Sequence, residues 1–213
     1  VNVNTPTQVG TATNWAFVSG GTLHSLAIKT NGTLWTWGNN QSGQLGDGST
    51  SNRLSPVQIG SDTDWQKGSC GDLHTLAIKT DGTLWACGGN FQGQLGIGNS
   101  ILSVNTPVQI GTDTDWELIS SGYSHSMGVK TDGTLWAWGN NIVVQLGLGN
   151  SSFRLYTPEQ VGTNTNWEYV SCGADFTISL NSNNTLWASG INNHGQLGDI
   201  STSVSRSSPE TVN

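Results

Sequence analysis

The chain has 213 residues, and its 7 Lys and Arg against 14 Asp and Glu give a formal net charge of −7. So few cations cannot neutralise a row of phosphates, which argues against nucleic acid and anionic membrane surfaces as partners. Three Cys are too few for a disulfide-stapled scaffold. No apolar run approaches the ~18 residues of a membrane span, so we expect no membrane insertion. Val1–Asn4 does not have the pattern of a signal peptide.

A repeat of about fifty residues organises the whole chain. It is marked by prolines that are 50, 51, 51 and 51 residues apart, namely Pro6, Pro56, Pro107, Pro158 and Pro209. Tryptophans follow the same steps, at Trp15, Trp65, Trp116 and Trp167. We therefore predict a single repeat domain over residues 1–213, with units at 6–55, 56–106, 107–157 and 158–208 and the start of a fifth unit at 209–213.

Each unit contains four short predicted strands. In the second unit they cover Pro56–Ile59, Trp65–Ser69, Leu76–Lys79 and Leu84–Cys87. A proline at the start of the first strand indicates an outer strand, because proline cannot donate a hydrogen bond to a sheet ladder. No helical period occurs in the pattern of apolar residues, so we predict an all-β fold of four four-stranded antiparallel units.

The turn between the third and fourth predicted strands carries the clearest local signal. It reads Asn31-Gly32, Asp81-Gly82 and Asp132-Gly133 in the first three units and Asn183-Asn184 in the fourth. Asn-Gly and Asp-Gly supply the positive φ angles of a type I′ hairpin turn. A four-stranded sheet cannot bury both of its faces alone, whereas sheets stacked around an axis bury them against one another. The units are therefore predicted to be β-propeller blades.

Two motifs recur in register with this period. The first unit has Gly21-Thr22-Leu23-His24 and then Trp37-Gly38-Asn39-Asn40-Gln41-Ser42-Gly43-Gln44-Leu45-Gly46, and the other units repeat both motifs with few changes. They resemble the repeat of the regulator of chromosome condensation family. That resemblance implies blades of a propeller that has seven blades in the family. Four units then imply a partial propeller, or one that is completed by self-association.

The units depart from the family pattern at two positions. His24, His74 and His125 occupy the histidine position, but the fourth unit has Phe176. The third unit has Val144 where the other units have the signature glycine. A valine at positive φ would be strained, so we expect the loop around Val144 to change conformation.

Two sets of polar residues could bind metal ions but also fit structural roles. The three histidines could form a metal-binding ring, but Phe176 at the fourth position favours a packing role with a hydrogen bond to the neighbouring blade. Asp62 and Asp64, with their counterparts in the third unit, could bind calcium, but Asn or Ala in the other units favours a turn-capping role. No catalytic triad, phosphate loop or paired-carboxylate motif occurs, so we predict no catalytic residue, no metal and no cofactor.

The long loops after the fourth predicted strand vary while the scaffold around them hardly changes. A rigid base with variable loops is typical of a recognition surface. The candidate partner-binding residues are apolar and lie in or beside these loops: Ile101, Leu102, Ile142, Val143, Phe153 and Tyr156. The alternative is that these side chains fold under their own loops.

These observations predict a non-enzymatic protein-binding or scaffold module. The low Lys content and the abundance of Thr, Ser, Asn and Gly favour part of a bacterial secreted or cell-surface protein, with a cytoplasmic location as the alternative. The protein partner is not identified by any residue. Two other functions stay open: guanine-nucleotide exchange on a small GTPase, which the family resemblance implies, and a structural repeat that self-assembles.

Overall fold

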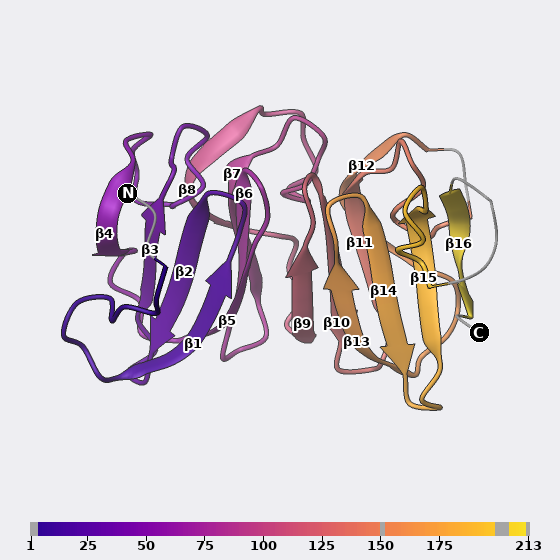
Figure 1. Cartoon of the computed structure of the whole chain (residues 1–213), viewed down its shortest axis with the longest axis horizontal. Coiled ribbons are helices and arrows are strands. Elements are labelled where there is room, and N and C mark those ends of the chain that lie inside the picture. Colours follow the sequence, from indigo (N-terminus) through magenta and orange to yellow (C-terminus); the bar gives the residue numbers. More distant parts are fainter. Residues whose placement is uncertain (1–3, 150–151, 199–204, 212–213) are drawn as a thin grey trace.

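The computed structural model describes residues 4–149, 152–198 and 205–211, and all the regular structure in these ranges is β-strand. The strands form four sheets that follow one another along the chain, from the indigo first sheet to the yellow end of the fourth (Figure 1). No helix of the described residues is long and apolar enough to span a membrane.

Each sheet contains four consecutive strands. The first has β1 (Trp15–Gly20), β2 (His24–Lys29), β3 (Leu34–Gly38) and β4 (Arg53–Gln58). The second has β5 (Trp65–Cys70), β6 (His74–Lys79), β7 (Leu84–Gly89) and β8 (Ser103–Gln109). The third has β9 (Trp116–Ser121), β10 (His125–Lys130), β11 (Leu135–Asn140) and β12 (Arg154–Gln160). The fourth has β13 (Trp167–Cys172), β14 (Phe176–Asn181), β15 (Leu186–Ile191) and β16 (Ser205–Thr211).

Neighbouring strands are antiparallel and follow sequence order within each sheet, which confirms the prediction of four-stranded antiparallel propeller blades. The first strands of successive blades lie side by side, because β1 contacts β5, β5 contacts β9 and β9 contacts β13. They are therefore the inner strands of the blades. The first and fourth blades lie at opposite ends of the row (Figure 1).

The blade boundaries differ from the unit boundaries by one strand. The strand that contains Pro56 is β4, and it pairs with β3 of the preceding unit, with Trp35 opposite Gln58 and Thr36 opposite Val57. Our expectation that the four strands of one unit form one sheet was therefore wrong. Proline sits on the outer strand, as predicted. In the same way, the backbone of β16, which runs from the end of the fourth unit into the fifth, completes the fourth sheet.

Successive blades pack through tryptophans. Leu26 and Leu34 of the first blade lie in one core cluster with Trp65 of the second blade, which is 4% exposed. Trp65 also meets Trp85 edge to face, with 6.0 Å between the ring centroids and an angle of 78° between the rings. Burial of such large apolar surfaces is the main stabilising contribution between blades. The pattern repeats around Trp116 and Trp167.

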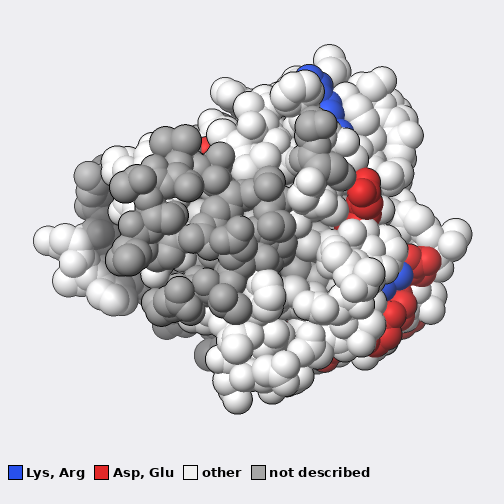
Figure 2. Space-filling model, turned by 90° about the vertical axis from the view of Figure 1, so that its right-hand side faces the viewer, with Lys and Arg blue, Asp and Glu red and all other residues white. Residues whose placement is uncertain are grey.

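Charged side chains are sparse among the described residues on the side of the molecule that carries the fourth blade. Among the described atoms in Figure 2, uncharged side chains dominate, and the acidic groups outnumber the few basic ones. This distribution agrees with the net charge of −7.

Candidate protein-binding surface

The two faces of the blade row differ in their loops. One face, here called the loop face, carries the turns between the first and second strands (21–23, 71–73, 122–124 and 173–175). It also carries the described residues of the long loops between the third and fourth strands (39–52, 90–102, 141–149 with 152–153, and 192–198). The opposite face carries the short hairpins between the second and third strands. The candidate partner-binding residues lie on or next to the long loops, so the loop face is the candidate binding surface.

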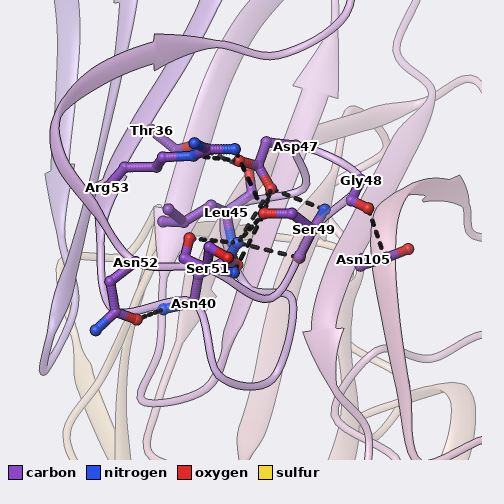
Figure 3. Close-up of polar contacts among 10 residues, drawn as sticks. All are labelled: Thr36, Asn40, Leu45, Asp47, Gly48, Ser49, Ser51, Asn52, Arg53 and Asn105. Carbon is purple, nitrogen blue, oxygen red and sulfur yellow. Dashed lines mark hydrogen bonds and ion pairs between the residues drawn. The ribbon is translucent and has the colours of Figure 1, made fainter.

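A buried asparagine holds each described long loop in place. In the first blade Asn40 accepts a hydrogen bond from the backbone of Leu45 (2.9 Å), and its Nδ2 donates to Asp47 Oδ1 (3.0 Å) and to the carbonyls of Ser49 (3.1 Å) and Ser51 (3.2 Å), as Figure 3 shows. One side chain therefore ties together three parts of the loop. Such multiple bonds to one buried amide fix the loop conformation.

An ion pair closes the same loop. Arg53 Nε lies 2.6 Å from Asp47 Oδ2, and both groups appear beside Asn40 in Figure 3. Burial alone would raise the pKa of Asp47, but hydrogen bonds from Ser49, Arg53 and Asn40 hold that pKa below its usual value. The loop also bonds to the next blade, because Gly48 N donates to the Asn105 carbonyl (2.8 Å) and Asn105 Nδ2 donates to the Gly48 carbonyl (3.0 Å).

The second and third loops use the same asparagine. Asn90 accepts a bond from Leu95 N (3.0 Å) and donates to the Ile101 carbonyl (2.9 Å), while Asn141 accepts a bond from Leu146 N (3.1 Å). The loop around Val144 keeps this conformation. Val144 has a φ of 60°, so our expectation of a changed loop was wrong. Asn141 precedes Val144 and Leu146 follows it, so the hydrogen bond between these two residues holds the valine in the left-handed region despite its strain.

The structure places five of the six candidate residues on two neighbouring loops, and the sixth, Tyr156, in the strand that follows the second of them. Ile101, Leu102, Ile142 and Phe153 are exposed, and Phe153 is the most exposed of them at 72%. Ile142 and Phe153 lie close together, because the neighbouring Asn141 N donates to the Phe153 carbonyl (2.8 Å). The exposed side chains do not fold under their own loops.

The other two candidate residues are half-buried. Val143 lies within the third loop, and Tyr156 lies in β12, where its carbonyl accepts a bond from Gly98 of the second loop (2.7 Å). Tyr156 therefore supports the neighbouring loop more than it presents an apolar side chain to solvent.

Sequence reasoning missed exposed apolar residues on the same face. Leu23, Phe91 and Tyr123 are all exposed. Phe91 follows the buried asparagine of its loop, at the position that Ile142 occupies in the third blade, and Tyr123 lies in the turn before His125. These positions vary from unit to unit, which is the signal that could have found them. Each lies between recurring motif residues, so its variation is less conspicuous than that of the later part of each loop.

A groove of about 370 Å³ lies on the loop face between the second and third blades. Its apolar walls are Leu73, Phe91 and Tyr123, and its polar lining includes Asp72, Gln94 and Asp175. The adjacent carboxylate of Asp72 raises the pKa of the Tyr123 hydroxyl through its charge and a hydrogen bond. The groove brings together residues from the turns of three blades and the long loop of one.

The three histidines link successive blades beneath the turns of the loop face. Each Nε2 lies within hydrogen-bond distance of a hydroxyl of the next blade: His24 and Thr75 (2.8 Å), His74 and Ser126 (2.9 Å), His125 and Thr177 (3.1 Å). These hydroxyls already donate to the carbonyls of Gln44, Gln94 and Gln145. A hydroxyl has one proton, so the histidine Nε2 must be the donor. The ring is neutral, because the Nδ1 atom of each histidine is buried without a hydrogen-bond partner that could accept a second proton. Burial agrees with this, because it lowers the histidine pKa values, to about 3 for His74.

The aspartates that suggested calcium are paired with lysines. Lys79 Nζ lies 2.6 Å from Asp62 Oδ2 and 3.2 Å from Asp64 Oδ1, and it also lies 4.9 Å from the ring centroid of Trp65. The third blade repeats the arrangement around Lys130. These aspartates thus bind an ammonium group rather than cap a turn. Within the described residues, no group of three or more His, Cys, Asp or Glu side chains is arranged to hold a metal ion.

Comparison with known proteins matches most of the chain to one repeat. The model described as the regulator of chromosome condensation (RCC1) repeat matches residues 31–78, 81–129 and 132–180. A second model of the same repeat matches residues 15–44, 65–94 and 167–196. Human protein RCC2 is 32% identical over 178 residues, which cover 82% of this chain and 24% of RCC2.

Solved structures show the same fold. Yeast RCC1 (Prp20), in a crystal structure with Kap60 bound, is 20% identical with a TM-score of 0.88 over 98% of this chain and 51% of that one. A structure of Prp20p from Saccharomyces cerevisiae, described together with its binding to Gsp1p and histones, is 23% identical with a TM-score of 0.77 over 92% of this chain and 50% of that one. The chain therefore spans about half of these solved chains and about a quarter of RCC2.

The comparisons overturn one prediction. We expected an extracellular or cell-surface location from the low Lys content and the polar composition. That expectation was wrong, because RCC2 and yeast RCC1, which this chain resembles, are intracellular proteins. A polar, acidic surface is compatible with either environment, so composition could not distinguish them. The expected bacterial origin is tested by none of these findings.

Proposed function

We propose that this chain, which belongs to the regulator of chromosome condensation (RCC1) repeat family, is a non-enzymatic protein-binding module whose partner docks on the loop face. The observation that carries this proposal is the set of exposed apolar side chains on loops that buried asparagines hold in place. Exposed apolar groups on rigid loops are suited to binding, because little conformational entropy is lost when a partner orders them.

The kind of partner is supported by the relatives. Kap60 is bound to yeast RCC1, and Prp20p is described with Gsp1p and histones, all of which are proteins. Aromatic side chains such as Phe153 and Phe91 are enriched at the core of protein interfaces. For this chain we propose a protein partner on the same grounds, without transferring the identity of any of those partners.

Affinity capture tests the proposal. The immobilised chain is compared with a triple variant, Ile101→Ser, Ile142→Ser and Phe153→Ser, in an extract of the organism that encodes it. We expect proteins that bind the chain to be lost with the triple variant. The matched control is Tyr169→Ser, which removes an exposed ring from β13, outside the loop face. Equal capture by the chain and the triple variant, or no capture by either, would contradict the proposal.

Nucleotide exchange on a small GTPase is the competing function within this family. It makes a separate kinetic prediction, which is faster release of labelled GDP. Gsp1p is the available probe, because Prp20p is described as binding it. If the chain accelerates GDP release from Gsp1p at catalytic concentration, the non-enzymatic part of our proposal is wrong.

A second candidate function, self-association, is favoured by the uncovered faces of the first and fourth blades. On the first blade Val18 is 71% exposed and lines an apolar hollow of about 220 Å³ with Trp15 and Trp37. On the fourth blade Leu186 is 45% exposed, although its counterpart Leu34 is 2% exposed against the next blade. These faces have the same chemistry as the two sides of an internal blade contact.

We therefore propose that a second copy of the chain covers these faces from end to end. Leu186 of one copy would then pack against Trp15 of the other, as Leu34 packs in one cluster with Trp65 inside the chain. Sedimentation velocity tests this contact. The mass should increase with concentration and return to that of a monomer in Val18→Asp, whereas a monomer at every concentration would exclude it.

A further inference from the structure

The groove between the second and third blades has properties that point to a particular ligand. Its walls are the aromatic rings of Phe91 and Tyr123, which lie on the turns and loop of two different blades. Aromatic faces attract cations, and a planar guanidinium also stacks on them. The groove of about 370 Å³ is large enough for one long side chain with the backbone around it.

The carboxylates in the groove lack a cationic partner. Asp72 is 6% exposed, and Asp175 lines the same space. None of the ion pairs between described residues includes either of them. Arg154 does not supply the missing charge, because its Nη1 donates to the Phe91 carbonyl (3.3 Å) and to the Tyr156 hydroxyl (3.4 Å). A nearly buried carboxylate without a cation favours a positively charged ligand.

A buried amide provides an independent indication. Gln94 is 2% exposed and lines the groove, and its Oε1 accepts a bond from Gln92 N (2.9 Å). In the first blade the corresponding Gln44 donates its Nε2 to Asn39 Oδ1 (2.8 Å). The second blade has Gly89 at the position of Asn39, and no hydrogen bond from Gln94 Nε2 is found among the described contacts. In the third blade the counterpart Gln145 Nε2 is unpartnered too, although Asn140 occupies the position of Asn39 there. An unpartnered amide donor next to carboxylates fits the carbonyl of a peptide.

We propose that this groove binds an arginine side chain carried on a peptide segment of a partner protein. The carboxylates of Asp72 and Asp175 pair with the guanidinium, Phe91 and Tyr123 stack against it, and Gln94 Nε2 donates to a backbone carbonyl of the segment. This inference deepens the proposed protein-binding function, since it assigns the chemistry that one part of the loop face recognises. It rests on that function only for the claim that the segment belongs to a protein.

Short peptides test the proposal directly. The probe is a blocked Gly-Gly-Arg-Gly-Gly peptide, and its citrulline counterpart has nearly the same shape without the charge. Binding is followed by NMR through the side-chain amide of Gln94 and the backbone signals of residues 72–73 and 123–124. We expect saturable shifts with the arginine peptide, at a dissociation constant on the order of 1 mM, and no saturation with citrulline. Equal binding of both peptides, or the absence of saturation with arginine, would overturn the proposal.

Variants locate the binding site. Asp72→Asn keeps the shape of the side chain and should weaken binding about tenfold, the effect of losing one charge-assisted hydrogen bond. Asp62→Asn, on the opposite face, is the matched control and should leave the affinity unchanged. Phe91→Leu changes an exposed position, so it tests stacking in a folded protein. An unchanged affinity in Asp72→Asn would refute the assignment.

The lysine version of the peptide separates a requirement for guanidinium from attraction to any cation. Weaker binding of lysine supports the stacked geometry, whereas tighter binding of lysine would show that the assigned ligand is wrong. A failure of the arginine site can be distinguished from a failure of the proposed protein-binding function. If the peptides do not bind while the triple loop variant still loses its captured proteins, the loop face binds proteins and only the arginine site is refuted.

Discussion

Acidification from pH 7 to pH 5 should destabilise this protein through its three inter-blade histidines. Burial lowers the pKa of His24 to about 4, of His74 to about 3 and of His125 to about 4, from an ordinary value of 6.5. The neighbouring histidines also disfavour a charge on His74. At pH 5 these rings are therefore neutral in the folded protein and protonated in the unfolded chain.

The sign and size of the effect follow from proton linkage. Between pH 6.5 and the folded-state pKa values the unfolded chain binds more protons, so the free energy of unfolding decreases as the pH falls. One pKa unit corresponds to about 1.4 kcal/mol, and pH 5 lies about 1.5 units below the unfolded-state pKa of 6.5. Each histidine therefore lowers the free energy of unfolding by about 2 kcal/mol at pH 5. The three together remove about 6 kcal/mol, which is comparable with the total stability of about 5–15 kcal/mol of an ordinary domain.

Urea unfolding monitored by tryptophan fluorescence measures this loss. His74→Phe, which copies Phe176 of the fourth blade, should reduce the difference between pH 7 and pH 5 by about a third, and Ser126 keeps its bond to the Gln94 carbonyl in that variant. The exposed His194 is the control, and His194→Asn should leave the difference unchanged. A loss of less than about 1 kcal/mol in the unmodified protein would refute the link between burial and acid sensitivity.

Three further predictions concern particular side chains. Val144→Gly should raise the free energy of unfolding by about 1 kcal/mol in urea titrations, because it relieves the positive φ of 60°, and a decrease would show that packing of the valine outweighs its strain. Asn40→Ala should lower that free energy by about 3 kcal/mol, since several buried hydrogen bonds are lost, and an unchanged midpoint would contradict its role in the loop. Burial raises the thiol pKa values of Cys70, Cys87 and Cys172 to about 12. A disulfide reagent at pH 8 should therefore react with the folded protein far more slowly than with the urea-unfolded chain, and equal rates would disprove this protection.

The candidate surface was only partly predictable. Exposed residues such as Ile101 and Phe153 could be identified because they are apolar residues in variable loops. Tyr156 matched the same description, but the structure uses it within β12 beside the neighbouring loop, and sequence alone does not distinguish these environments. Phe91 occupies the repeat position of Ile142, so the same reasoning could have identified it; Ile142 is conspicuous because it begins an apolar run with Val143, whereas Phe91 is a single apolar residue between polar neighbours.

Local patterns were sufficient for the blade architecture. The period of the prolines and tryptophans, and the positive φ that Gly32 and Gly82 supply to their hairpins, depend on neighbours in the chain, so they can be recognised without coordinates. The sheet that the proline-containing strand joins could not be recognised in this way, because the strand pairs across a long loop with the sheet of the preceding unit. The groove of Asp72, Gln94 and Tyr123 likewise arises only where two blades meet. Contacts between residues far apart in the chain depend on the packing of whole sheets, and only the folded molecule specifies them.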